Sequence, residues 1–296
     1  NPLIFRRTFT PTLIITIHIG KNMNTIETTD FAELYKNHMQ QAQRTKKEPE
    51  HWDKRAEKMA ENCANPNDPY LIKFREMMDF SDAETLLDVG CGPGSISIHV
   101  ADKFKKIIGI DYSTGMLTVA KRRAAQAGIH HADFLHYSWE DNWDALPPCD
   151  IAVASRSTLV MDLKAALLKL NRQAKLRVYT THTVSPTFVD QRILRLLGRN
   201  VPTLPTYIYA VNILNQMGIH PKVDYIRSHN CQNNFNSLEQ FIDSINFSVG
   251  PLNENEIAHL TTYYHESMKN DVALISPTRD WAMVSWDVVP ESELTL

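Results

Sequence analysis

The feature that most constrains this chain is a glycine-rich loop that follows an apolar run. The stretch reads Leu-Leu-Asp-Val-Gly-Cys-Gly-Pro-Gly, with its acid at Asp88 and its glycines at Gly90, Gly92 and Gly94. The pattern of residues 95–104 predicts a helix directly after it. Glycine permits positive φ and close approach to the main chain, and a helix N-terminus presents unpaired N–H groups. Such a turn can also be a tight connection without a ligand, but strand, loop and helix in this order are what a nucleotide-binding loop needs.

The spacing of the glycines distinguishes two kinds of cofactor. A dinucleotide-binding loop reads Gly-x-Gly-x-x-Gly, whereas this loop reads Gly-x-Gly-x-Gly and has Ser95 where the later glycine would fall. The stretch resembles the first motif of the Rossmann-like S-adenosylmethionine-dependent methyltransferases, in which an acidic residue precedes Gly-x-Gly-x-Gly. The resemblance implies that Asp88 and the loop bind S-adenosyl-L-methionine. A dehydrogenase of the same fold is the alternative, and Ser95 argues against it.

A second acidic residue follows one strand later. Residues 105–111 form a short β-branched run that ends in Asp111, and a carboxylate at a strand end can accept hydrogen bonds from both hydroxyls of a ribose. Asp111 could instead simply lie beside Ser113, a good N-cap for the next helix, and the two interpretations are compatible. The stretch resembles the second motif of the same family. That resemblance implies that Asp111 binds the ribose, with Tyr112 and Met116 also in the cofactor site and Met116 against the adenine.

A third strand is predicted at residues 132–137, and Ser138, Trp139 and Glu140 follow its carboxyl end. The family commonly reads Gly-Asp-Ala-Glu here, with the acid receiving the adenine amino group and the next backbone N–H reaching a ring nitrogen. Ser138 replaces that acid, which removes the expected carboxylate. Trp139 can still supply the N–H, and Glu140 is a reserve acceptor. Trp139 could also be an anchor between surface and core.

Two further strands are predicted at residues 149–154 and 175–181. Ligands of open parallel sheets bind beyond the carboxyl ends of the strands, so we expect Ser155 and Arg156 to face the transferable methyl group. Arg156 could bind the acceptor or pair with an acid at the rim. His182, which follows the second of these strands, could be a base or a packing residue. Ser155 is therefore a predicted cofactor contact, and Arg156 and His182 are the catalytic candidates.

The N-terminal part of the chain separates into two regions. Residues 1–22 contain no acid and an apolar stretch too short to span a bilayer; we interpret them as an over-extended start that is poorly ordered, with a weak targeting segment as the alternative. Residues 23–80 show helical patterns and form a predicted cap. Within the cap, Asn-Asp-Pro-Tyr lacks the second proline of the motif found in amino-methylating enzymes. Asp68 and Pro69 are better read as an N-cap and a first helical residue.

The remaining chain predicts an α/β fold with a doubly wound, seven-stranded, mostly parallel sheet. Residues 81–296 form the methyltransferase domain, and its last two strands are predicted at residues 222–227 and 281–288. A helical insertion separates these two strands and forms a lid at about residues 235–275. We expect the lid and the N-terminal cap to shape the acceptor pocket.

The composition and net charge of the chain bear on which kinds of molecule it can bind. A net charge of −3 and a pI near 6.5 give no electrostatic footprint for nucleic acid or an anionic membrane. The four cysteines and twelve histidines show no metal-ligand spacing, so we predict no metal site, and free thiols fit the cytoplasm.

We therefore expect a small-molecule methyl acceptor and a partly apolar pocket closed by aromatic residues of the lid. These residues are Phe241, Phe247, Tyr263 and Tyr264. Some of the four are expected to be core residues instead, and helical spacing does not distinguish the two roles. A non-catalytic S-adenosylmethionine-binding protein and an RNA or protein methyltransferase are the alternatives. The oligomeric state is not predicted.

Overall fold

The computed structural model describes residues 25–42, 48–229 and 235–295. The chain divides into two compact units, Asn1–Asp30 and Phe31–Leu296. In the first unit, the described residues form a turn in which Thr28 N donates to Thr25 O at 3.2 Å. The predicted extension at residues 1–22 lies outside the described residues. All helices and strands named below belong to the second unit.

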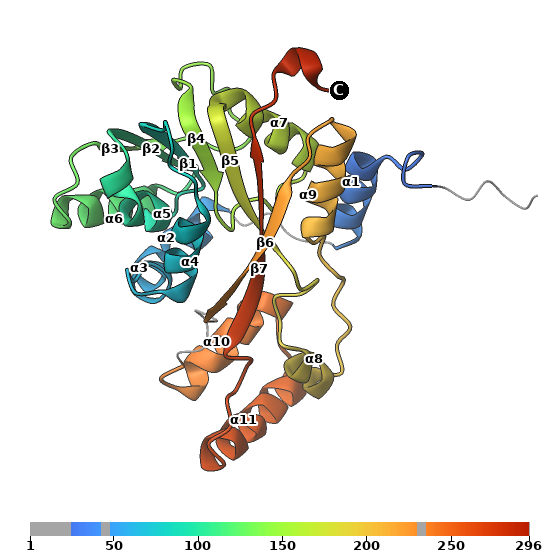
Figure 1. Ribbon diagram of the computed structural model, residues 1–296. Coiled ribbons are helices and arrows are strands. Elements are labelled where there is room, and N and C mark those ends of the chain that lie inside the picture. Colours follow the sequence, from blue (N-terminus) through green and yellow to red (C-terminus); the bar gives the residue numbers. More distant parts are fainter. Residues whose placement is uncertain (1–24, 43–47, 230–234, 296) are drawn as a thin grey trace, which may run out of the picture. The chain divides into compact units, whose positions relative to one another are not determined.

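A seven-stranded sheet is the centre of the second unit (Figure 1). The strands are β1 (Thr85–Val89), β2 (Lys106–Asp111), β3 (Ala132–His136), β4 (Cys149–Ala154), β5 (Ala174–Thr183), β6 (Lys222–His229) and β7 (Thr278–Asp287). They are arranged in the order β3-β2-β1-β4-β5-β7-β6. The first five strands are parallel, and β7 pairs antiparallel with both β5 and β6. The predicted doubly wound, mostly parallel fold is confirmed.

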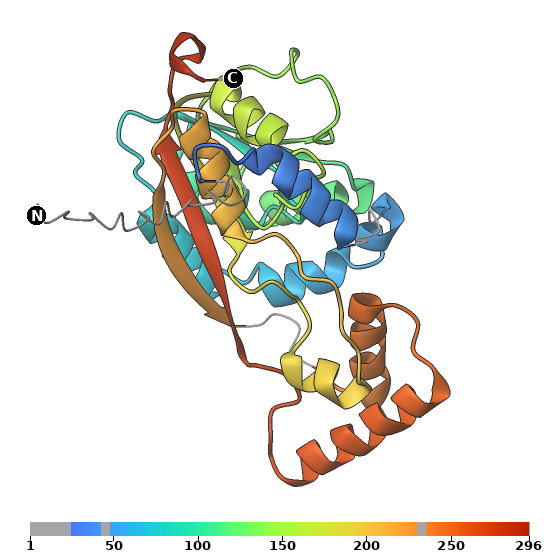
Figure 2. The same cartoon turned by 90° about the vertical axis from the view of Figure 1, so that its right-hand side faces the viewer.

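Helices lie on both sides of this sheet (Figure 1). In chain order they are α1 (Phe31–Gln41), α2 (Pro49–Asp53), α3 (Ala56–Cys63), α4 (Pro69–Met77), α5 (Ser95–His99), η1 (Ala101–Lys103), α6 (Thr114–Gln126), α7 (Leu163–Gln173), α8 (Gln191–Leu197), α9 (Tyr207–Gln216), α10 (Leu238–Val249), α11 (Glu254–Lys269) and η2 (Glu291–Glu293). Figure 2 shows α1, α7 and α9 side by side on one face of the sheet. Within the described ranges, no helix is both long and apolar enough to cross a membrane.

Alternating residues of the buried strands divide the core between the two faces. In β1, Leu87 and Val89 pack in the cluster that includes residues of α1, α7 and α9. Leu86 points the other way and packs with residues of α4 and α5. Successive side chains of a strand point to opposite faces, so apolar residues at successive positions of a buried strand supply the core on both faces of the sheet. The parallel arrangement brings the carboxyl ends of β1, β2 and β4 to one edge of the sheet.

Local capping explains where several helices begin. Asp68 caps α4 by accepting from Tyr70 N at 2.8 Å, and Pro69 is the first helical residue, as predicted. The helical pattern at residues 51–59 is interrupted, because Lys54 and Arg55 form a turn that separates α2 from α3.

The helix predicted after the glycine-rich loop is shorter than expected. The helix predicted at residues 95–104 ends at His99 and continues as the 3-10 turn η1. α8 begins at Gln191, because the side chain of Asp190 caps it by accepting from Arg192 N at 2.8 Å.

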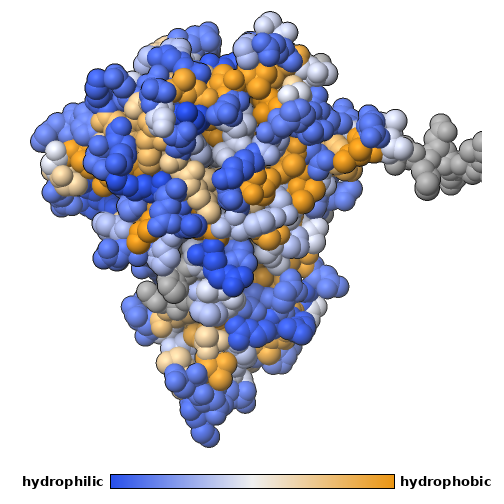
Figure 3. Space-filling view, viewed as in Figure 1, coloured by the Kyte–Doolittle hydropathy of each residue, from blue (hydrophilic) through white to orange (hydrophobic). Residues whose placement is uncertain are grey.

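The helical insertion between β6 and β7 contains α10 and α11, which share an apolar core with α8. The predicted lid at about residues 235–275 contains α10 and α11; because α8 shares their core, we call the three helices together the lid. Phe241 is fully buried in this core, and its ring lies 6.3 Å from that of Tyr263 and 5.9 Å from that of Tyr264. These rings therefore hold the lid helices together, and Phe241 does not line an open pocket. Figure 3 accordingly shows mostly hydrophilic residues over α11, at the lower end of the view.

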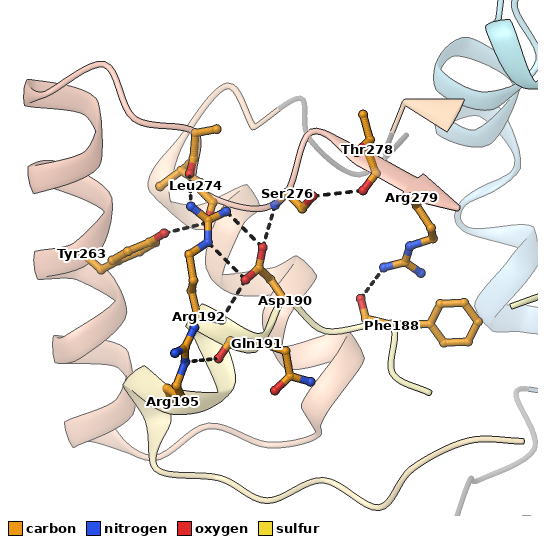
Figure 4. A network of polar contacts seen from close by, with 11 residues as sticks. Phe188, Asp190, Gln191, Arg192, Arg195, Tyr263, Leu274, Ser276, Thr278 and Arg279 are labelled. Atoms are coloured by element: carbon orange, nitrogen blue, oxygen red, sulfur yellow. Dashed lines mark hydrogen bonds and ion pairs between the residues drawn. The ribbon is translucent and has the colours of Figure 1, made fainter. Parts of the chain in front are cut away.

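The chain segments that enter and leave the lid are joined by a polar network (Figure 4). Asp190, which precedes α8, accepts from the backbone N–H of Ser276, ahead of β7, at 2.6 Å. Arg192 donates to the carboxylate of Asp190 and to the carbonyl of Ala273. Arg279 donates to Phe188 O at 2.5 Å. Hydrogen bonds to charged groups are among the stronger ones in proteins. This network therefore fixes the segment that leads into α8 relative to the segment that leads from α11 into β7.

Replacing Gly109 by Ala is expected to lower the free energy of unfolding by about 1–3 kcal/mol. A Cβ at this position in β2 would lie 2.7 Å from Cδ1 of Phe134 and 3.1 Å from Sγ of Cys91. Urea denaturation measures the loss. Combining Gly109→Ala with Phe134→Leu frees space, so the double variant should lose less than the sum of the two single losses. Unchanged stability in Gly109→Ala would contradict the close packing.

Candidate functional site

The glycine-rich loop after β1 has the backbone conformation predicted for it. Gly90, Gly92 and Gly94 have φ values of +66°, +55° and +76°. Gly90 N and Cys91 N both donate to Ile110 O, at 2.8 and 3.0 Å, so the loop is held against the end of β2. The third glycine is the N-cap residue of α5. The order of strand, loop and helix is therefore confirmed.

Two of these glycines meet different surroundings. A Cβ at Gly90 would lie 2.4 Å from Cβ of Ser157, so packing within the protein excludes a side chain there. A Cβ at Gly92 would meet nothing within 4 Å. Gly92 thus combines positive φ with open space, which is the arrangement that lets a ligand reach the main chain.

Asp88 lies beneath the loop, near the end of β1. It is 1% exposed, and its Oδ2 accepts from the backbone N–H of Ser97 at 3.1 Å and from Ser97 Oγ at 2.6 Å. Burial raises the pKa of Asp88 to about 6, although the hydrogen bonds from Ser97 lower it, and the nearby charge of Asp111 raises it further. Asp88 therefore ties β1 to α5 and supports the loop from below.

Asp111 ends β2 and joins the loop to α6. Its Oδ2 accepts from Gly92 N and its Oδ1 accepts from Ser113 N, both at 2.9 Å. Ser113 in turn caps α6 by accepting from Met116 N at 3.1 Å, so the predicted N-cap is confirmed. Burial raises the pKa of Asp111, while the backbone hydrogen bonds from Ser113 and Gly92 lower it. A carboxylate has about four acceptor positions, so Asp111 can accept further hydrogen bonds from a ligand.

Tyr112 and Met116 follow the end of β2, and Met116 packs against the N-terminal helices α2 and α3. Tyr112 is half-buried, and its carbonyl accepts from Nε2 of His136 at 3.0 Å if that nitrogen carries the proton. Met116 is buried with Ala56 of α3, and Trp52 of α2 packs against them. The roles of Tyr112 and Met116 at the adenosine stay predictions.

The loop after β3 is closed by its own polar contacts. Ser138 N donates to the carboxylate of Asp141 at 2.7 Å. Trp139 Nε1 donates to Ser157 O at 3.0 Å, so the indole ties this loop to the segment after β4. The side chain of Trp139 is therefore an anchor, as one of the two interpretations predicted. The contact of its backbone N–H with an adenine stays a prediction. Glu140 is exposed, and its role as a reserve acceptor is likewise untested.

A hydroxyl cluster lies at the carboxyl end of β4. Ser155 Oγ and Thr181 Oγ1 each lie 2.7 Å from the hydroxyl of Tyr70, which is fully buried. Arg156 has a φ of +57°; its N–H donates to Thr181 Oγ1 at 2.9 Å, and its guanidinium lies 4.2 Å from the centre of the Tyr70 ring. Tyr70 was missed as a site residue, because nothing in a helix-start pattern shows that a side chain of α4 reaches β4.

His182 occupies a different place from the one predicted. β5 continues to Thr183, so His182 lies within the strand and is 7% exposed. Its Nδ1 lies 3.0 Å from Thr158 Oγ1 and its Nε2 lies 2.8 Å from Thr180 Oγ1. Burial lowers the pKa of His182 to about 3. These contacts favour the packing interpretation, because the ring is neutral near pH 7 and both nitrogens have partners.

Known proteins share both the motif region and the fold. Residues 86–175 match a family model described as a methyltransferase domain. An uncharacterized protein of Haemophilus influenzae is 36% identical over 264 residues, which cover 89% of this chain and 98% of that protein.

Two solved structures share the fold at 13% sequence identity. One is a candidate methyltransferase of Bacillus halodurans, with a TM-score of 0.54, covering 74% of this chain and 99% of its own. The other is an S-adenosylmethionine-dependent methyltransferase of Thiobacillus denitrificans in complex with S-adenosyl-L-homocysteine. Its TM-score is 0.50, and the match covers 78% of this chain and 96% of that one.

Replacing Asp88 by Asn is expected to change how stability depends on pH. The pKa of Asp88 is about 6 in the folded protein, against an ordinary value of 3.8. The stability contributed by the protonated carboxyl is therefore fully present below about pH 4 and is lost as the pH rises through about 6. Asn does not ionise, so Asp88→Asn should gain about 2–3 kcal/mol relative to the parent between pH 4 and pH 7.

Urea denaturation across this pH range measures the difference. Asp82→Asn, at an exposed turn position, is the control and should follow the parent. Parallel pH profiles for the parent and Asp88→Asn would contradict the raised pKa.

Proposed function

This chain belongs to the class I, Rossmann-like family of S-adenosylmethionine-dependent methyltransferases, and from that premise we propose that it transfers a methyl group to a small-molecule acceptor. The observation that carries the proposal is the contact between the carboxylate of Asp111 and the backbone N–H of Gly92, at 2.9 Å. This contact brings an acceptor for ribose hydroxyls next to a glycine with open space above it.

S-adenosyl-L-methionine fits this set of residues chemically. We assign Asp111 to its ribose hydroxyls, Gly92 to close approach of the sugar, and the backbone N–H of Trp139 to the adenine. The cofactor carries a positive sulfonium. The pKa values of Asp88 and Asp111 are both raised by burial, and a nearby positive charge favours the ionised form of a carboxyl group. A cationic ligand therefore complements the two acids.

Catalysis by this chain is proposed to consist mainly of positioning. When bound, the cofactor supplies an electrophilic methyl group on sulfur, and the protein has to hold the acceptor atom in line at ~3–3.5 Å and exclude water. We assign this task to the carboxyl end of β4, where Tyr70 holds Ser155. A positive φ at a residue other than glycine is unfavourable, and strained residues cluster at functional sites. The φ of Arg156 therefore supports an acceptor-binding role for this residue.

The small-molecule class is inferred from charge and from the lid. The net charge of −3 gives little support for phosphate neutralisation, on which nucleic-acid binding largely depends. The lid helices have a core of their own, and an ordered insertion of this kind is suited to covering a compact ligand. An RNA or protein acceptor is the competing possibility.

Methyl transfer from labelled cofactor into a fractionated cell extract tests the proposal. We expect the label in the low-mass pool. Label confined to a nuclease-sensitive or protease-sensitive polymer would contradict the acceptor class. Tight cofactor binding without transfer to any fraction would contradict the enzymatic function and favour a non-catalytic binding protein.

Asp111→Ala is expected to weaken S-adenosyl-L-homocysteine binding by roughly 10- to 150-fold, because charge-assisted hydrogen bonds are worth about 1.5–3 kcal/mol. Isothermal titration calorimetry measures the affinity. Asp133→Ala in the neighbouring strand β3 removes an exposed carboxylate that pairs with Lys106 and should bind like the parent. An unchanged affinity in a folded Asp111→Ala protein would show that the ribose assignment is wrong.

Gly92→Val is expected to weaken binding more than Asp111→Ala, because a branched Cβ would occupy the approach of the ligand and resist positive φ. Gly128→Val is a matched control. Gly128 also has a positive φ, of +69°, and open space at its Cβ position, but it follows α6 outside the loop. Both variants should lose stability, whereas the control should retain the affinity of the parent in calorimetry. Equal affinities in the two variants would rule out close approach at Gly92.

A further inference from the structure

Residues 53–55, at the end of α2 and in the turn that follows it, touch the cofactor side of the molecule through Asp53. Its Oδ1 accepts from Ser113 Oγ at 2.5 Å and from Gly115 N at 2.8 Å. Ser113 is fully buried and donates its own N–H to Asp111. Asp53 is thus linked to the carboxylate assigned to the ribose through one residue, Ser113, which donates its hydroxyl to Asp53 and its backbone N–H to Asp111. The charge of Asp53 lies at the N-terminus of α6, where a negative charge is stabilising.

The fit between this turn and α6 leaves no spare room. A Cβ at Gly115 would lie 2.7 Å from Cα of Asp53, so even a methyl group would push the turn away. Met116, the next residue of α6, and Val119, one turn later, pack against Ala56 of α3. The turn therefore has a defined position relative to the loop after β2.

The same turn touches the lid through Arg55. Its guanidinium lies 3.6 Å from the centre of the Phe247 ring in α10, within the range of a cation–π interaction. Burial lowers the pKa of Arg55, and the negative charge of Asp243, also in α10, opposes this shift. A single residue, Lys54, therefore lies between the contact of Asp53 with the start of α6 and the contact of Arg55 with α10.

We propose that residues 53–55 couple the ribose end of the cofactor site to the lid, so that cofactor binding strengthens the contact between Arg55 and α10. Asp53 is a positioning residue for Asp111 and acts through Ser113. Arg55 follows the position of the turn, and through its contact with Phe247 it links that position to α10. This inference rests on the proposed cofactor site. Coupling between two sites is reciprocal, so a lid that is held more firmly by the cofactor also holds the cofactor more tightly.

Hydrogen exchange of the α10 amides, with and without saturating S-adenosyl-L-homocysteine, tests the coupling. In the parent, the ligand should slow exchange in α10. Arg55→Ala should abolish this slowing. It should also weaken ligand binding by the factor by which the ligand slows α10 exchange in the parent, as reciprocity requires. Asp53→Ala should weaken the ligand by about 5- to 30-fold through its lost hydrogen bonds and also abolish the slowing. Gly115→Ala, which displaces the turn while keeping Asp53, should change both quantities in the same direction.

The matched control is Glu57→Gln, which weakens an exposed ion pair between α3 and Arg122 without touching the ribose loop or α10. It should keep the affinity and the α10 exchange of the parent. Ligand-dependent slowing that persists in Arg55→Ala would overturn the coupling while leaving the cofactor site intact. A parent protein that does not bind S-adenosyl-L-homocysteine would overturn the proposed cofactor site, and the coupling with it.

Discussion

The carboxylate of Asp111 is the interaction on which the arrangement of the site depends. One oxygen accepts from Gly92 in the loop after β1 and the other accepts from Ser113 at the start of α6. Two segments that belong to successive β–α units are therefore held by a single buried side chain. The cost of burying this acid is reduced by backbone N–H donors, which stabilise its ionised form. A ligand that contacts Asp111 is consequently linked through this side chain to both segments.

Local chemistry accounts for the parts of the fold that could be predicted. Glycine at every second position predicted the positive φ values of the loop, and Ser113 and Asp68 predicted the starts of α6 and α4, because these effects act within a few residues. The contacts of Tyr70 with Thr181 and of Asp53 with Ser113 join residues that are 111 and 60 positions apart. Sequence periodicity carries no information on such pairs, since it reports which face of an element is apolar and not what that face meets.

His182 illustrates the same limit at a candidate catalytic residue. The strand pattern predicted an end at residue 181, but pairing with β7 continues to Thr183 and takes the ring into the core. Thr180, at the i−2 position, lies on the same face of the strand, and its hydroxyl bonds to the ring. In the sequence alone, polar residues at alternate positions, such as Thr180 and His182, are typical of a strand face that is exposed to solvent. The antiparallel partner that buries it comes from a strand almost a hundred residues later.

The proposal that catalysis consists mainly of positioning agrees with the location of the buried polar contacts at the carboxyl end of β4. The proposed methyl transfer from a sulfonium requires alignment more than proton transfer, and the proposal assigns that alignment to the carboxyl end of β4. Tyr70 holds this strand end in place, because its buried hydroxyl meets both Ser155 and Thr181 and its ring carries the guanidinium of Arg156. Burial raises the pKa of Tyr70, which keeps the hydroxyl neutral and able to donate. A neutral donor that is already engaged on both sides is suited to holding neighbouring groups in place, and the acceptor must then supply its own nucleophilic lone pair.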